Sequence, residues 1–192
     1  MTRKIAKRIV WLAVFAAVIV LAVLSLREGL HRLDLVRYPL KYTDYVEAAA
    51  AENGVDPLLI YAVIRTESGF DPAAESGVGA RGLMQITEVT FDWIKSKIAA
   101  DEDLTFDDLY DPAVNIRFGV YYFSACLERY HGDVSTAAAA YHSGWGTVDG
   151  LLESSDYTAD GHILHTFPYQ QMGLYVTKIT RAYERYQALY ED

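Results

Sequence analysis

Hydrophobic and polar positions divide the chain into two parts with different patterns. Residues 9–26 form an uncharged run built almost wholly from Ile, Val, Leu, Ala, Trp and Phe. At 1.5 Å rise per residue this run would make roughly 27 Å of helix, close to the hydrocarbon thickness of a bilayer. The pattern therefore predicts one transmembrane helix over residues 9–26.

A cleaved secretory signal is the alternative for this segment. Signal peptides usually have an apolar region of about 7–15 residues, followed by a small-x-small cleavage site. The run here is longer, and Val-Leu-Ser-Leu at residues 23–26 offers no good site. We therefore expect a retained anchor, and the lack of a Cys directly after the run argues against a lipid-anchored lipoprotein.

Beyond the anchor, hydrophobic residues recur at helical spacing, and strand-like alternation is nearly absent. Asp56-Pro57 and Asp111-Pro112 each place an N-cap residue before a proline at the first helical position. Glycines stand where three periodic stretches should end: Gly54, Gly69 and Gly132. We expect helices over residues 43–53, 57–67, 87–99, 112–130, 134–141, 147–152 and 169–189.

The part after the anchor has the length of one domain, with no internal repeat and no Gly/Ser-rich linker. We expect residues 27–41 to form a short stalk and residues 42–192 to form one mainly α domain. Its helices would be separated by a Gly-rich loop at residues 69–82 and a polar loop at residues 153–166.

Charge is distributed unevenly along the 192 residues, which carry a net charge of −9. Four cations precede the apolar run: Arg3, Lys4, Lys7 and Arg8. They predict a cytoplasmic tail over residues 1–8 and an extracytoplasmic location for residues 27–192. From Arg27 onward 13 basic residues face 26 acidic ones. A body this acidic is unsuited to binding DNA or RNA, since phosphate binding needs Lys and Arg.

Glu67 continues the apolar stripe of the helix predicted over residues 57–67. Leu59, Val63 and Glu67 share one face at i, i+4 and i+8. Burial among aliphatic side chains and the negative end of its own helix would both raise the pKa of this carboxyl group. A carboxylic acid that stays protonated near neutral pH can act as a general acid. The alternative is that Glu67 points to solvent where the helix ends.

The residues after Glu67 favour the catalytic interpretation. Residues 67–72 read Glu-Ser-Gly-Phe-Asp-Pro, and residues 76–86 read Ser-Gly-Val-Gly-Ala-Arg-Gly-Leu-Met-Gln-Ile. Residues 140–144 read Ala-Tyr-His-Ser-Gly, and Tyr175-Val176 opens the last helix. The order and spacing resemble the lytic transglycosylases of the soluble-lytic-transglycosylase (SLT) type. The resemblance covers roughly residues 43–186, including Asp-Pro-x-x-Asn-Ile at residues 111–116.

The resemblance implies a mainly α, lysozyme-like fold and a substrate, the peptidoglycan glycan strand. It implies cleavage of the bond between N-acetylmuramic acid (MurNAc) and N-acetylglucosamine (GlcNAc), with formation of 1,6-anhydroMurNAc. Glu67 would act as general acid and then as general base. Further family positions point to substrate-binding residues: Ser76, Gln85, Tyr141, His142, Gln171 and Tyr175. Neither a cofactor nor a metal is implied.

The sequence contains other acidic, histidine and cysteine residues that could carry chemistry. A two-carboxylate glycosidase needs a second acid about 5–9.5 Å from the first. Asp71 and Glu75 are the nearest candidates in the sequence, and we expect both to cap turns or to be solvated. His162 and His165 with Asp160 suggest a metal site by composition alone, so we expect none there. The single cysteine, Cys126, lies in an apolar helical stretch and should be buried.

Four positions depart from the family pattern. His142 and Ser143 replace the Asn and Ala of the second motif, although histidine can still donate or accept one hydrogen bond. Gln171 replaces a Glu found in many members, and Glu88 replaces a frequent Pro. His142 and Gln171 motivate one alternative, a non-catalytic glycan-binding or scaffold module of the cell envelope. The alternative within enzymes is a hydrolytic muramidase on the same fold, which would use water in place of the 6-hydroxyl.

Overall fold

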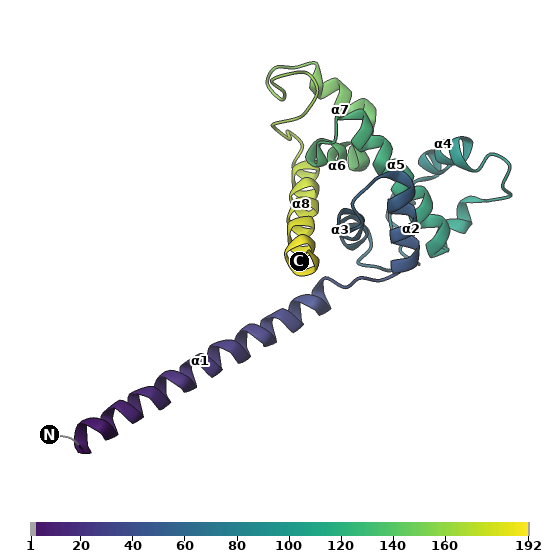
Figure 1. Ribbon diagram of the computed structural model, residues 1–192. Helices are drawn as coiled ribbons and strands as arrows, with labels where there is room; N and C mark the ends of the chain where they lie inside the picture. The colour runs from purple at the N-terminus through teal and green to yellow at the C-terminus, as the bar shows by residue number, and fades with distance from the viewer. Residues whose placement is uncertain (1–2, 192) are drawn as a thin grey trace. The chain divides into compact units, whose positions relative to one another are not determined.

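The computed structural model describes residues 3–191, in two separately compact units, residues 1–39 and residues 40–192. The first unit contains one long helix, α1 (Arg3–Arg37), as Figure 1 shows. The predicted apolar run is helical, and the helix continues through residues 27–37 of the predicted stalk. Residues 1–2 of the predicted cytoplasmic tail and residue 192 lie outside the described residues.

Helix α1 is the one helix of the described residues that is long and apolar enough to cross a membrane. By length and composition, the candidate span among the described residues is Val14–Arg37, which overlaps the predicted range of 9–26. In the stretch beyond Leu26, Arg32 donates a hydrogen bond to Glu28 one turn earlier, at 2.9 Å. Such exposed i, i+4 pairs add a few tenths of a kcal/mol, about 0.3–0.5, to a helix.

The second unit is built from helices joined by loops (Figure 1). Within residues 40–191 the only β-type pairing is in isolated bridges, between residues 75 and 81 and between residues 81 and 86. The predicted mainly α fold is therefore confirmed. Its elements are α2 (Thr43–Asn53), α3 (Pro57–Glu67), α4 (Glu88–Ile98), the 3₁₀ helix η1 (Phe106–Tyr110), α5 (Pro112–Arg129), α6 (Val134–Ser143), α7 (Trp145–Leu152) and α8 (Gln170–Tyr190).

Helix starts follow the capping residues found in the sequence. Asp56 accepts a hydrogen bond from the Leu58 amide at 2.8 Å, and Asp111 accepts one from the Ala113 amide at 2.7 Å. Each cap supplies an acceptor for an amide that has no partner inside its helix. The sequence did not predict η1, or that α7 begins at Trp145. Gly144, with φ +82°, separates α6 from α7 at a single residue.

Helix α3 occupies the middle of the second unit and carries the catalytic candidate at its last residue. Six consecutive residues, from Leu59 to Ile64, are buried, so this helix is covered on all sides. It packs against α2 and α8, while α6 packs against α5, α7 and α8. Glu67 at the end of α3 and His142 near the end of α6 both contact Tyr175 in the second turn of α8.

Candidate active site

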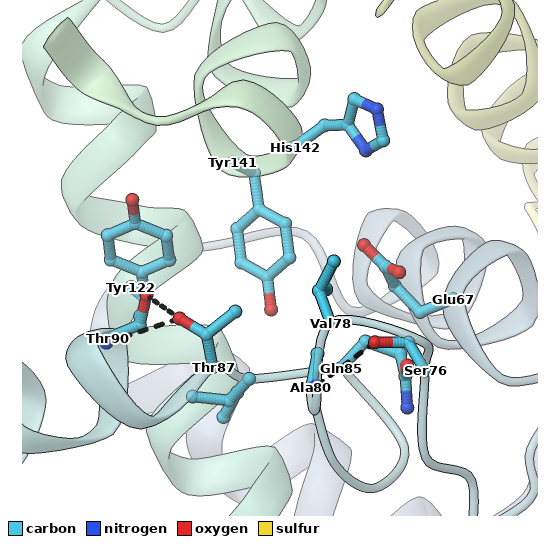
Figure 2. A pocket seen from close by; sticks show the side chains of 11 residues that line it. Glu67, Ser76, Val78, Ala80, Gln85, Thr87, Thr90, Tyr122, Tyr141 and His142 are labelled. Carbon is cyan, nitrogen blue, oxygen red and sulfur yellow. Dashed lines mark hydrogen bonds between the residues drawn. The ribbon is translucent and has the colours of Figure 1, made fainter. Parts of the chain in front are cut away.

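Glu67 is part-buried at the C-terminal end of α3 and lines a pocket of about 230 Å³. The phenolic oxygen of Tyr175, from α8, donates a hydrogen bond to Glu67 Oε1 at 2.6 Å. Figure 2 shows Glu67 reaching toward the pocket from one side and Tyr141 and His142 reaching toward it from α6. The carboxyl group therefore faces the pocket instead of being fully solvated.

The protonation of Glu67 is set by two opposing effects. Burial penalises the charged carboxylate and raises the pKa of Glu67 from 4.5 to about 7. The hydrogen bond from Tyr175 favours the charged form and offsets part of that rise. A carboxylic acid with a pKa near 7 can both donate and accept a proton at neutral pH.

The pocket contains a single carboxyl group. Its lining consists of Glu67, Ser76, Val78, Ala80, Gln85, Ile86, Thr87, Thr90, Tyr122, Tyr141 and His142. Asp71 is exposed and accepts a hydrogen bond from the Ala73 amide at 2.9 Å, as expected for a turn cap. Glu75 is exposed and accepts one from Tyr110 at 2.9 Å. Neither acid lines the pocket.

The Gly-rich loop is fastened to the end of α3 and to α5. Ser68 donates its hydroxyl proton to the Leu83 carbonyl at 2.8 Å. The fully buried amide of Asn115 accepts from the Met84 amide at 2.7 Å and donates to the carbonyls of Arg81 (2.9 Å) and Leu109 (2.8 Å). These bonds fix the backbone that forms one wall of the pocket.

Close packing at this wall explains one glycine of the motif. Gly82 has φ +74°, and a Cβ built on it would lie 2.2 Å from the Leu109 carbonyl oxygen and 2.1 Å from Asn115 Nδ2. Gly79 also has a positive φ, +76°, but a Cβ there would meet nothing within 4 Å. Gly82 is thus required by both conformation and space, and Gly79 by conformation alone.

Ser76 and Gln85 line the pocket and also brace the loop. The Ser76 hydroxyl oxygen accepts from the Ala80 amide at 3.0 Å. The Gln85 amide nitrogen donates to the carbonyls of Ala74 (3.1 Å) and Gly82 (3.0 Å). Among residues 3–191, neither the Ser76 hydroxyl proton nor Gln85 Oε1 has a hydrogen-bond partner, so each can bind a ligand in the pocket.

Two residues of α6 frame the pocket above Glu67. Tyr141 donates to the Met84 carbonyl at 2.8 Å, and burial raises its pKa well above 10, so this phenol stays protonated. His142 stacks on Tyr175, with ring centroids 4.5 Å apart and an angle of 15° between the planes. Partial burial lowers the pKa of His142 from 6.5, which favours the neutral imidazole at pH 7.

The other predicted residues take different positions. Tyr175 is 7% exposed and is not among the residues that line the pocket. Its hydroxyl group contacts Glu67 from the protein interior. Gln171 is exposed one turn earlier on α8 and is not among the lining residues. Both remain predictions as substrate-binding residues.

Thr90 and Tyr122 were not predicted as site residues. Thr87 caps α4, and its hydroxyl lies 2.9 Å from that of Thr90, so the two line the pocket together. The i, i+3 spacing from the Thr87 cap is the only sequence signal for Thr90. The helical spacing of Tyr122 within α5 does not distinguish a position at the rim of the core from a position in the pocket.

Outside the pocket, the cysteine and histidine side chains of residues 3–191 are not grouped as metal ligands. In the described part of the chain no group of three or more His, Cys, Asp or Glu side chains could hold a metal ion. Asp160 accepts hydrogen bonds from the amides of His162 (2.8 Å) and Ile163 (3.1 Å), which makes it a turn residue. Cys126 is fully buried, as predicted, and burial raises the pKa of its thiol to about 12.

Comparisons with known proteins identify the family of the chain. The family model of the transglycosylase SLT domain matches residues 44–162. The transglycosylase of Enterobacteria phage PRD1 is 38% identical over 118 residues, which cover 62% of this chain and 40% of that protein. Membrane-bound lytic murein transglycosylase C of Yersinia enterocolitica is 30% identical over 168 residues, covering 77% of this chain and 47% of the relative. The chain spans less than half the length of these relatives.

Solved structures show the same fold. An inactive mutant of the lytic transglycosylase Slt from Pseudomonas aeruginosa aligns with a TM-score of 0.72 at 30% identity, covering 80% of this chain and 25% of that one. The 70-kDa soluble lytic transglycosylase from Escherichia coli aligns with a TM-score of 0.74 at 26% identity, covering 83% and 26%. The predicted lysozyme-like helical fold is therefore confirmed, and the chain belongs to the transglycosylase SLT domain family.

Proposed function

We propose that this protein is a membrane-anchored lytic transglycosylase that cleaves the MurNAc–GlcNAc β-1,4 bond of peptidoglycan. The observation that carries the proposal is the Glu67 carboxyl group, which lines the pocket with a pKa of about 7 and has no second carboxylate beside it. The family membership and the names of the relatives, among them lytic murein transglycosylases, support the same activity and substrate.

In the proposed reaction Glu67 acts twice. The protonated carboxyl group donates its proton to the glycosidic oxygen, and the bond from that oxygen to C1 of MurNAc breaks. The carboxylate then takes the proton of the MurNAc 6-hydroxyl while that oxygen bonds to C1, which gives the 1,6-anhydro product. The proton returns to Glu67, and no water is consumed. One group with a pKa near neutrality suffices for both steps.

The surrounding residues divide into binding and positioning roles. We assign sugar binding to Ser76, Gln85 and His142, which line the pocket with polar atoms. Tyr175 holds Glu67 through its 2.6 Å hydrogen bond. Tyr141 contributes an aromatic wall, because its hydroxyl is already bonded to the Met84 carbonyl. Gln171 would contact only a part of the substrate that extends beyond the pocket toward α8.

The anchor belongs to the same proposal. Helix α1 is long and apolar enough to span a bilayer, and the cations before its apolar run favour a cytoplasmic N-terminus. The catalytic domain would then lie outside the cytoplasm, where peptidoglycan is found. A protease added to intact spheroplasts should digest residues 40–192 while a tag before residue 1 stays protected. Digestion of the tag, or a mature protein that begins after residue 26, would contradict the retained single-pass anchor.

Product masses separate the proposed reaction from its rivals. The full chain in detergent is incubated with purified peptidoglycan, and the released muropeptides are weighed. We expect 1,6-anhydroMurNAc ends with the wild type and none with Glu67→Gln. Reducing MurNAc ends alone would indicate a hydrolytic muramidase. Binding of peptidoglycan without any cleavage would indicate a glycan-binding module.

A further inference from the structure

The exposed side of α8 carries a line of basic residues. Helix α8 forms one side of the second unit (Figure 1). Leu174, Lys178, Arg181 and Arg185 follow one another at i, i+4, i+7 and i+11, which places them on a single helix face. Lys178 and Arg181 are exposed, Leu174 is 49% exposed, and Arg185 is part-buried. We call these four residues the basic stripe.

The basic stripe contrasts with the charge of its domain. Residues 40–192 contain 10 basic and 24 acidic residues, and three of the ten basic residues lie in the stripe. Among residues 3–191 no ion pair joins Lys178 or Arg181 to an acidic side chain. Three arginines elsewhere in the domain do have such partners, in the pairs Arg81–Asp107, Arg117–Glu102 and Arg129–Asp149.

The rest of α8 leaves the stripe as its outer face. The buried residues of the helix include Val176 and Ile179, and α8 packs against α3 and α6. One acidic residue, Glu184, is exposed within the helix. At 3.6 residues per turn Glu184 lies about 60° around the helix from Arg181 and about 120° from Lys178, so it borders the stripe without dividing it.

The length of the chain limits how far the domain can move from a membrane that holds α1. Helix α1 ends at Arg37 and α2 begins at Thr43, so five residues join them. This connection spans at most about 20 Å, and residues 27–37 add about 16 Å of helix beyond the apolar run. The domain would stay within about 40 Å of the bilayer, roughly its own diameter. So short a tether keeps the local concentration of lipid high, and weak contacts then suffice for docking.

An anionic lipid surface fits the chemistry of the basic stripe. Lys and Arg extend their charges toward phosphate groups, while their methylene stems and an apolar residue such as Leu174 contact the boundary of the acyl chains. Each Lys or Arg close to such a surface strengthens binding about fivefold. The same surface repels the acidic remainder of the domain, so the stripe would determine which side of the domain faces the lipid.

We propose that the basic stripe docks the catalytic domain onto the anionic lipid surface of the membrane that holds α1. This inference rests on the anchor of the proposed function and adds an orientation to it. The buried side of α8 contributes Tyr175, which is bonded to Glu67. Docking would therefore hold the Glu67 pocket at a fixed height above the bilayer and direct cleavage to glycan strands near the membrane.

The test reconstitutes the full chain in vesicles and measures how close α8 comes to the lipid. A fluorophore is attached at Thr177→Cys, an exposed position beside the stripe, and is quenched by lipids with a nitroxide on the head group. Ser96→Cys, exposed on α4, is the reference position. Cys126 is fully buried and its thiol has a pKa of about 12, so it should not take the label. With phosphatidylglycerol in the vesicles we expect strong quenching at Thr177→Cys and little at Ser96→Cys, and with phosphatidylcholine alone little at either.

Charge variants test the stripe itself. Arg181→Gln should lower the ratio of docked to free domain about fivefold, and Arg181→Glu about 30-fold, because the second also adds a repulsive charge. Lys97→Glu is the matched control, since it reverses an exposed cation of α4 and changes the net charge by the same amount as Arg181→Glu. It should leave the ratio unchanged. Circular dichroism checks that each variant is folded.

Three results would overturn the docking: equal quenching at the two labelled positions, equal quenching in the two lipids, or an unchanged ratio in Arg181→Glu. Loss of self-association in Arg181→Glu with unchanged quenching, measured by sedimentation velocity, would assign the stripe to a second copy of the chain.

Carbonate extraction of the vesicles separates the docking from the anchor. A chain that stays in the vesicles without quenching at Thr177→Cys would refute the docking and leave the anchor standing. Quenching at Thr177→Cys in a chain that carbonate releases would support the docking and refute the anchor.

Discussion

Removing the Tyr175 hydroxyl group, which donates a hydrogen bond to Glu67, should shift the alkaline limb of the pH–activity profile to higher pH. The hydrogen bond from Tyr175 to Glu67 Oε1, at 2.6 Å, stabilises the carboxylate and lowers the pKa of Glu67 against the effect of burial. A hydrogen bond to a charged group contributes about 1.5 kcal/mol or more, which corresponds to about one pKa unit. Tyr175→Phe should therefore raise the pKa of Glu67 from about 7 to roughly 8.

The sign follows from the role of the group. Glu67 must be protonated to start the reaction, so activity falls as the pH rises through its pKa. At pH 8 roughly a tenth of the wild-type carboxyl groups would be protonated, against about half in Tyr175→Phe. The phenylalanine ring keeps the stacking surface for His142, which is 4.5 Å from Tyr175 in the wild type.

The assay is release of soluble muropeptides from purified peptidoglycan between pH 5 and pH 9, with each variant scaled to its own maximum. His142→Phe is the control, because it preserves an aromatic stack and leaves the hydroxyl bond to Glu67 intact. An alkaline limb of Tyr175→Phe that coincides with the wild type, or that moves to lower pH, would refute the reasoning about Glu67.

The remaining predictions concern stability. The pKa of Glu67 is higher in the folded protein, about 7, than in the unfolded chain, where it is 4.5. The free energy of unfolding therefore falls as the pH rises through this range, because the buried carboxyl group becomes charged. Urea unfolding should then show Glu67→Gln to be more stable than the wild type by about 2 kcal/mol at pH 9, with a smaller difference at pH 5; no change with pH would contradict the buried acid. Asn115→Ala removes hydrogen bonds to the Met84 amide, to the Arg81 carbonyl and to the Leu109 carbonyl of η1, and should cost about 4 kcal/mol in the same assay; a loss below about 1 kcal/mol would show that the loop is held elsewhere. Gly82→Ala should cost at least about 3 kcal/mol, and Gly79→Ala only about 1 kcal/mol, because only the first introduces a clash; equal losses would contradict the packing at Gly82.

Local chemistry made much of the fold predictable. The Asp-Pro pairs fixed the starts of α3 and α5, because cap and proline act on the residues next to them. The apolar stripe that ends in Glu67 predicted the burial of this acid from helix geometry. Both inferences need only contacts within one helix.

Contacts between helices were not predictable in the same way. The bond from Tyr175 to Glu67 joins residues that are 108 positions apart, and no spacing within either helix announces it. The convergence of Trp93, Tyr122 and Trp145 likewise depends on how α4, α5 and α7 pack. Such sites arise from tertiary structure. Sequence patterns can therefore suggest candidate residues, but they do not show which of these residues lie together in the folded protein.

The reaction in water enriched in oxygen-18 tests the central claim most directly. The full chain in detergent digests peptidoglycan, and mass spectrometry measures the isotope content of the new MurNAc ends. We predict 1,6-anhydro ends without solvent oxygen, since the 6-hydroxyl closes on C1 under the control of Glu67, and no product with Glu67→Gln. Reducing ends that carry one oxygen-18 atom would show that water is the nucleophile and would contradict the account.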